Sequence, residues 1–224
     1  MPYNAMKFAA VIFDLDGTII KSEEEWAKAY AVVLEKLGVK TNGNDPPTRG
    51  LSIKSNWTNF LIKYNVKTNK TVEELETLTY IEYQKLIPQV TLNDGVLEFI
   101  DGLKENGSPL ALATSTNWET ADKVLKHFGL ESSFESVTTG EEVVNPKPAP
   151  DIYILASEKL GVEPLDCLVI EDSLPGITAA KEAGMKVIAV RKDEEGSDNL
   201  DTADLVVEGF SEITLKAIDG VALD

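Results

Sequence analysis

Apolar segments that alternate with helical patterns constrain the fold of this chain most. Residues 7–13 form an apolar run that ends at Asp14, and such a run is typical of a strand buried on both faces of a parallel sheet. Further strands are predicted at residues 109–113, 136–138, 167–170, 186–190 and 204–207. Helical patterns fall between them, at residues 95–105, 117–128, 150–160, 175–183 and 211–218. This alternation predicts an α/β fold, a parallel sheet with helices on both faces.

One long stretch interrupts the alternation. Between residues 22 and 89 the predicted elements are helices, at residues 23–37, 52–64 and 72–87, with a polar loop at residues 41–49. We interpret the stretch as a small helical unit inserted after the first strand, with hinges near residues 20–22 and 90–94. The predicted domains are a core of residues 1–21 and 92–224 and an inserted domain of residues 22–91.

Charge and composition exclude several classes of partner. The chain has 21 basic and 38 acidic residues, a net charge of −17, which repels nucleic-acid backbones and anionic lipid surfaces. No apolar run approaches the ~20 residues of a membrane-spanning helix, and residues 1–9 lack the layout of a secretory signal. The single cysteine, Cys167, lies in an apolar run and cannot form an internal disulfide. We therefore expect no nucleic-acid or membrane partner and a cytoplasmic location.

Two aspartates follow the first strand directly. Asp14 and Asp16 belong to the run Asp14-Leu15-Asp16-Gly17-Thr18, and ligand sites of open parallel sheets lie beyond the carboxyl ends of the strands. Two carboxylates there are costly unless a cation or protons compensate them. Gly17 permits a turn that aims the two side chains differently. The spacing alone leaves two interpretations open, a catalytic pair or two carboxylates that cap a loop.

The motif resembles the first motif of the haloacid dehalogenase superfamily, DxD followed by x and Thr or Val. Three further motifs of that family follow in order, each at the end of a predicted strand or in the loop that leaves it. They are Thr114, Lys147 in Asn145-Pro146-Lys147-Pro148-Ala149-Pro150, and the pair Glu171-Asp172 before Ser173-Leu174-Pro175-Gly176. The resemblance covers nearly the whole chain and implies a Rossmann-like core.

The resemblance also implies a chemistry. It is that of a Mg²⁺-dependent phosphatase that hydrolyses a small phosphorylated metabolite through an aspartyl-phosphate. Asp14 is expected as the nucleophile and Asp16 as the proton-transfer group. Thr114, with Ser115 as a rival, is expected to hold the phosphoryl group, and Lys147 to neutralise it. The expected metal site comprises Asp14, the backbone carbonyl of Asp16 and Asp172, with Glu171 further from the ion.

Each later motif has a structural alternative. Lys147 taken alone would be a surface lysine. Thr114 could cap a helix at its N-terminus, and Glu171-Asp172 could be an acidic pair that begins a helix. A non-catalytic binding module on the same fold is a further alternative, but a degenerate member should have lost Asp14, Asp16 or Lys147, and this chain keeps all three.

The inserted unit resembles the small four-helix cap of the β-phosphoglucomutase-like branch, whose side chains select the leaving group. Arg49 is the first candidate for substrate binding, with a surface role as the alternative. Trp26, Lys54 and Trp57 are further candidates, although tryptophans at helical positions are more often core residues. A sugar phosphomutase is the alternative function. Thr18 and Trp26 depart from the valine and cap histidine of such mutases, which favours the phosphatase. A capped monomer needs no partner to complete such a site.

Overall fold

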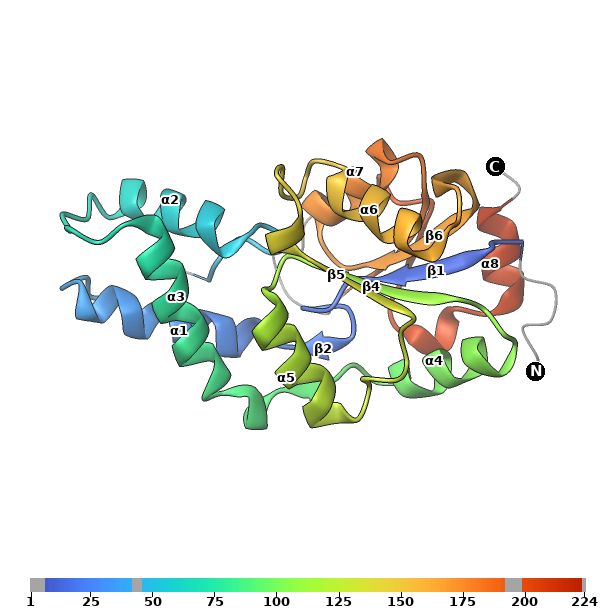
Figure 1. The fold of residues 1–224 in the computed structure, drawn as a ribbon, viewed down its shortest axis with the longest axis horizontal. Coiled ribbons are helices and arrows are strands. Elements are labelled where there is room, and N and C mark those ends of the chain that lie inside the picture. The colour runs from blue at the N-terminus through green and yellow to red at the C-terminus, as the bar shows by residue number, and fades with distance from the viewer. Residues whose placement is uncertain (1–6, 42–45, 192–198, 223–224) are drawn as a thin grey trace.

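The computed structural model describes residues 7–41, 46–191 and 199–222. Its centre is a six-stranded sheet in the order β5-β4-β1-β6-β7-β8 (Figure 1), and every neighbouring pair is parallel. The strands are β1 (Ala10–Phe13), β4 (Leu110–Thr114), β5 (Ser136–Thr139), β6 (Cys167–Glu171), β7 (Lys186–Val190) and β8 (Leu205–Val207). The predicted α/β fold with a parallel sheet is confirmed.

Alternate residues of the central strand serve the two faces of the sheet. Ala10 and Ile12 of β1 pack into one cluster with residues of α6 (Asp151–Leu160) and α7 (Leu174–Glu182). Val11 and Phe13 pack into the other, with residues of α4 (Val96–Glu105), α5 (Trp118–Phe128) and α8 (Leu215–Val221). Figure 1 shows these helices covering opposite faces. Because β1 is buried on both faces, its whole sequence is apolar.

The last predicted helix, residues 211–218, is wrong at its start. A 3₁₀ turn covers Phe210–Glu212, and α8 begins only at Leu215. The reason is local, because the Thr214 side chain accepts a hydrogen bond from the backbone N–H of Ala217 and so caps the helix at Thr214.

The inserted stretch lies beyond one end of the sheet (Figure 1). Its helices are α1 (Glu23–Lys36), α2 (Ile53–Lys63) and α3 (Val72–Gln84), three in the described part of the chain, and a 3₁₀ turn follows at Ile87–Gln89. The expected helix to residue 87 ends early, at Gln84, and the backbone N–H of Leu86 then bonds to the carbonyl of Tyr83, as the chain tightens into the 3₁₀ turn. β2 (Ile20–Lys21) pairs antiparallel with β3 (Thr91–Leu92), so the chain enters and leaves the stretch side by side. Residues 42–45 of the predicted loop lie outside the described residues.

Aromatic packing holds the inserted helices together. Trp57 of α2 is fully buried, and its Nε1 donates a hydrogen bond to Thr79 Oγ1 of α3 at 2.8 Å. The rings of Tyr30 and Phe60 lie 5.5 and 6.0 Å from it. Trp57 is therefore a core residue. Lys54 on the same helix is exposed and pairs with Glu73. Nowhere in the described chain is a helix long and apolar enough to cross a membrane.

Trp57→Ala should lower the free energy of unfolding by about 3–5 kcal/mol, because it leaves a cavity among the inserted helices. Lys54→Ala on the same helix is the matched control, and removing this exposed ion pair should change stability by about 0.5 kcal/mol or less. Urea unfolding followed by circular dichroism measures both. Equal, small effects would contradict the core assignment of Trp57.

Candidate active site

The predicted site residues converge at the carboxyl end of the sheet. Asp14 follows β1, Thr114 ends β4, and Glu171 ends β6. These three strands are neighbours, since Phe13 lies opposite both Leu112 of β4 and Ile170 of β6. The parallel sheet therefore brings together side chains that are more than 150 residues apart in sequence.

Lys147 lies at the centre of this group. It is buried, 2% exposed, and its Nζ donates hydrogen bonds to Asp14 Oδ1 at 2.6 Å and Glu171 Oε1 at 2.8 Å. Burial disfavours its charge, but the carboxylates of Asp14 and Glu171 outweigh burial and hold the pKa of Lys147 well above its usual value. The ammonium is thus permanently charged, and the surface-lysine interpretation is wrong.

Both oxygens of the Glu171 carboxylate accept several hydrogen bonds. Oε1 accepts from Lys147 and from the Tyr153 hydroxyl, at 3.0 Å. Oε2 accepts from the backbone N–H groups of Asp172 and Ser173, at 2.7 and 2.8 Å, and from the Ser173 hydroxyl at 3.0 Å. Burial acts to raise the pKa of Glu171, but Lys147 and these donors lower it below its usual value. Glu171 therefore holds Lys147 and the turn after β6 in place.

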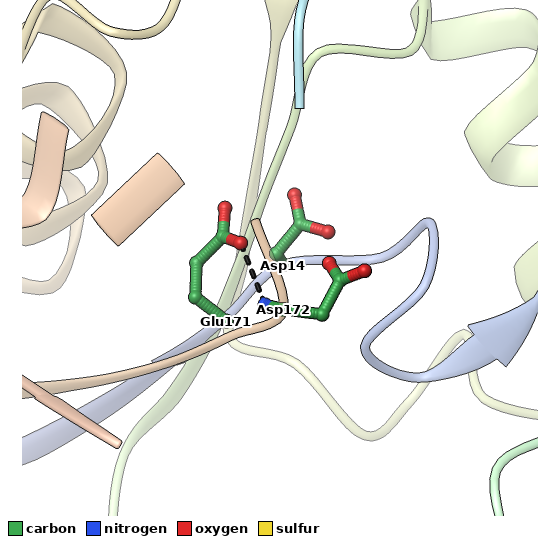
Figure 2. A group of neighbouring side chains, drawn as sticks. All are labelled: Asp14, Glu171 and Asp172. Atoms are coloured by element: carbon green, nitrogen blue, oxygen red, sulfur yellow. Dashed lines mark hydrogen bonds between the residues drawn. The ribbon is translucent and has the colours of Figure 1, made fainter. Parts of the chain in front are cut away.

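Asp14, Glu171 and Asp172 form an acidic cluster (Figure 2). One carboxylate oxygen of each lies within 4.8 Å of the others, and all three residues are buried. Burial raises the pKa of Asp14 to about 7, against the opposing charge of Lys147. Burial and the charges of Glu171 and Asp14 raise the pKa of Asp172 well above its usual value. Three carboxylates facing one ammonium leave an excess of negative charge that fits a hard divalent cation with oxygen ligands.

Asp172 has further neighbours. Thr18 Oγ1 donates a hydrogen bond to Asp172 Oδ1 at 3.2 Å, so the threonine of the first motif reaches the acidic cluster. The positive charge of Arg49 acts to lower the pKa of Asp172, which places the guanidinium within electrostatic reach. The helix-initiating interpretation of Glu171-Asp172 is wrong, because Ser173 is the N-cap of α7 and its side chain accepts from the N–H of Gly176.

Asp16 points elsewhere. Its Oδ1 accepts hydrogen bonds from Ser22 Oγ at 2.8 Å and Trp26 Nε1 at 2.7 Å, and its Oδ2 accepts one from Thr116 Oγ1 at 2.7 Å. Gly17 turns the chain just after it, with φ of 94°, as the sequence predicted. The Asp16 carboxylate is not part of the acidic cluster. Ser22 and Thr116 were missed from sequence, since serines and threonines in loops carry no distinctive pattern.

A cavity of about 380 Å³ opens between the inserted stretch and the sheet. Five of the candidate residues line it: Asp14, Asp16, Thr114, Ser115 and Arg49. Neither Lys54 nor Trp57 is among the described residues that line it. The other walls come from the inserted stretch and from Thr116; they comprise Ser22, Glu23, Glu24, Trp26, Ala27, Tyr30, Pro46, Pro47, Thr48, Gly50, Leu51, Ile53 and Asn56.

Thr114 does not cap a helix. Its Oγ1 accepts from the backbone N–H of Thr116 at 3.1 Å, while Asn117 is the N-cap of α5. The next wall residue, Ser115, donates its hydroxyl to the carbonyl of Gly50 at 3.4 Å. Gly50 has φ of +72°, and a Cβ there would lie 2.2 Å from Ser173 Oγ. The loop of the inserted stretch therefore approaches the core closely at Gly50, where a side chain has no room.

Comparisons with known proteins agree with this geometry. The family model described as haloacid dehalogenase-like hydrolase matches residues 11–190. The chain is 33% identical over 220 residues to hexitol phosphatase B of Escherichia coli, covering 94% of this chain and 96% of that protein. It is 32% identical over 216 residues to β-phosphoglucomutase of Bacillus subtilis, covering 93% of each. Its structure superposes on CbbY from Rhodobacter sphaeroides in complex with phosphate with a TM-score of 0.83, at 26% identity and over 95% and 99% of the two chains.

In cation-free buffer, Asp172→Asn should stabilise the protein at pH 7 and have little effect near pH 4. The folded-state pKa of Asp172 lies well above its usual value, so the wild type loses stability as pH rises from that usual value toward the folded-state value. The asparagine variant has no such loss. Thermal unfolding across this pH range measures the difference, and a variant destabilised equally at both pH values would contradict the expectation.

Proposed function

Because the chain belongs to the haloacid dehalogenase-like hydrolase family, we propose that it is a Mg²⁺-dependent phosphatase that hydrolyses small phosphomonoesters, sugar phosphates or similar. The observation that carries the proposal is the Asp14 carboxylate, which is held by a buried ammonium at the floor of a cavity and lies beside Asp172. We further propose residues 22–91 as a cap domain on a core of residues 1–21 and 92–224. One chain supplies every proposed group, so a monomer suffices.

In the first half of the reaction, an oxygen of Asp14 attacks the phosphorus. Lys147 donates to Oδ1, whereas in the described chain no side chain donates to Oδ2, which is therefore the oxygen free to attack. A new Oδ2–P bond forms as the bond from phosphorus to the leaving oxygen breaks. Asp16 protonates the leaving alcohol. Thr114 and Ser115 line the cavity beside Asp14, where their hydroxyls can hold the phosphoryl oxygens.

In the second half, water attacks the phosphorus of the aspartyl-phosphate. Asp16, now ionised, accepts the proton of that water, and the bond between Asp14 and phosphorus breaks to release inorganic phosphate. Lys147 keeps its charge throughout, because Asp14 and Glu171 hold its pKa high. It therefore offsets negative charge in both halves as a fixed point cation.

Asp14, Asp172 and the backbone carbonyl of Asp16 are the proposed Mg²⁺ ligands, and Glu171 orients Lys147 beside them. When bound, the ion supplies positive charge against the phosphoryl oxygens. Its positive charge would also oppose the burial and the like charges that raise the pKa of Asp14 and Asp172.

The charges of the cavity favour a phosphatase over a phosphomutase. Among the described residues that line it, Arg49 is the one cation, and its charge acts on Asp172 at the phosphoryl end. Glu23 and Glu24 line the inserted side, and Glu24 is paired with Lys28 at 2.8 Å. A mutase that works through a bisphosphate needs cations for its second phosphate. These walls suit a leaving group with hydroxyls and no second anion.

The purified protein should hydrolyse para-nitrophenyl phosphate when Mg²⁺ is supplied and lose this activity with EDTA. Asp14→Asn should abolish turnover, and Asp16→Asn should slow it by roughly 10²–10⁴-fold. Steady-state phosphate release measures all three, with Lys54→Ala as a surface control. Wild-type turnover by Asp14→Asn would refute the nucleophile assignment.

Across a panel of phosphorylated metabolites, kcat/KM for monophosphates of neutral polyols should exceed that for bisphosphates by at least about 10-fold, which corresponds to about 1.4 kcal/mol of repulsion. Glu23→Gln should shift this ratio toward the bisphosphates. A preference for bisphosphates in the wild type, or conversion of a sugar phosphate to its isomer when a bisphosphate activator is added, would favour the mutase.

A further inference from the structure

The indole of Trp26 makes a contact that its place in a hydrophobic core does not require. Its ring is 7% exposed and stacks on Tyr83 at 3.6 Å with an interplanar angle of 2°. Its Nε1 nevertheless points out of that stack and donates to Asp16 Oδ1 at 2.7 Å. The ring is thus fixed by packing, and its polar edge is directed at the proposed proton-transfer group.

Ser22 gives an independent sign that this arrangement is built around Asp16. Ser22 occupies the N-cap position of α1, where a serine side chain usually accepts from the first turn of the helix. Here its side chain makes no capping hydrogen bond, and its hydroxyl donates to Asp16 Oδ1 at 2.8 Å instead. The Ser22 hydroxyl thus binds the Asp16 carboxylate instead of capping α1.

The two oxygens of Asp16 are consequently unequal. A carboxylate oxygen offers about two acceptor positions, and Ser22 and Trp26 fill both on Oδ1. The hydrogen bond that reaches Oδ2 comes from Thr116, which leaves one position there, and the Tyr83 hydroxyl also interacts with the Asp16 carboxylate. The Thr116 hydroxyl can also rotate to accept a hydrogen bond when Oδ2 is protonated, whereas an indole N–H can only donate.

We propose that Trp26 is a positioning residue for proton transfer. Its N–H keeps Oδ1 an acceptor in both protonation states of Asp16, so that the proton is carried and delivered by Oδ2. Trp26 does not touch the reacting atoms; it acts through Asp16. The inference rests on the proposed phosphatase function. It adds the hydrogen bond by which the inserted helices orient Asp16, the proposed general acid.

The second layer of contacts ties Trp26 to the core. The Tyr80 ring lies 5.9 Å from Trp26, edge-on, and the Tyr80 hydroxyl accepts from the backbone N–H of Asn117 at 3.0 Å. Asn117 follows Thr116, the donor to Oδ2. The donors to the two oxygens of Asp16 are therefore held in place relative to each other. The inserted helices must pack against α5 for Asp16 to be oriented.

The test uses leaving groups of different acidity. An alkyl phosphate needs a proton on its leaving oxygen, whereas para-nitrophenolate leaves without one. Since kcat/KM reports the steps up to release of the leaving group, it isolates this proton transfer from the later hydrolysis of the aspartyl-phosphate. Trp26→Phe keeps a smaller aromatic ring beside Tyr83 and removes the N–H donor.

For Trp26→Phe we expect kcat/KM to fall about 10- to 100-fold for an alkyl phosphate and less than about 3-fold for para-nitrophenyl phosphate. Replacement of Trp26 by benzothienylalanine, an isostere with sulfur in place of the N–H, should give the same split. Trp118→Phe, at a residue that is 52% exposed on α5, is the control and should leave both values unchanged.

Equal losses on the two substrates would show a merely structural role and overturn the proposal, as would no loss on either. Failure of the proposed function has a different signature, because the wild type would then hydrolyse neither substrate with Mg²⁺, or Asp14→Asn would remain active.

Discussion

A buried ammonium organises the site. Lys147 has a side chain that is 1% exposed, and a charge so far from water is tolerated only when paired. Its partners, Asp14 and Glu171, come from the ends of β1 and β6, while Lys147 itself comes from the loop between β5 and α6. One set of ion pairs therefore fixes three separate segments, and Glu171 extends the order into the turn that carries Asp172.

The same charges explain why the site is poised for chemistry. Burial alone would neutralise the carboxylates, and it raises the pKa of Asp14 to about 7. Lys147 acts against this rise, and a divalent cation would act in the same direction. The fold thus concentrates negative charge at the proposed phosphoryl site. An anionic substrate can bind there only if cations dominate the local charge.

Asp16 belongs to a different network, which spans the inserted helices and the core. Trp26 of α1 and Ser22, the N-cap of that helix, approach from one side, and Thr116 approaches from the segment after β4. Gln84 of α3 strengthens this junction, since it donates to Thr120 at 2.9 Å and accepts from Lys123 at 2.6 Å, both on α5. The position of the inserted helices and the orientation of Asp16 are therefore coupled through direct hydrogen bonds.

The sequence alone determined the parallel sheet, because strands buried on both faces must be apolar throughout. The resemblance of its motifs to the haloacid dehalogenase superfamily also pointed to Asp14, Thr114, Lys147 and Asp172, which come together because the carboxyl ends of neighbouring parallel strands, and the loops that leave them, meet at one edge of the sheet. Element ends were less predictable. The start of α8 depends on a single capping hydroxyl at Thr214, which a periodic pattern does not show.

Only the tertiary structure decided how Asp16 is held and which charges face the cavity. Thr116 donates to Asp16 across 100 residues, and the sequence offered Trp26 as a substrate-binding candidate or a core residue, with no sign of a bond to Asp16. Whether an indole N–H donates to a distant carboxylate depends on how its helix packs against the sheet, and a local sequence pattern does not predict this packing. The residue types at and after the strand ends thus carry the proposed chemistry, and the packing of the inserted helices sets the geometry around Asp16.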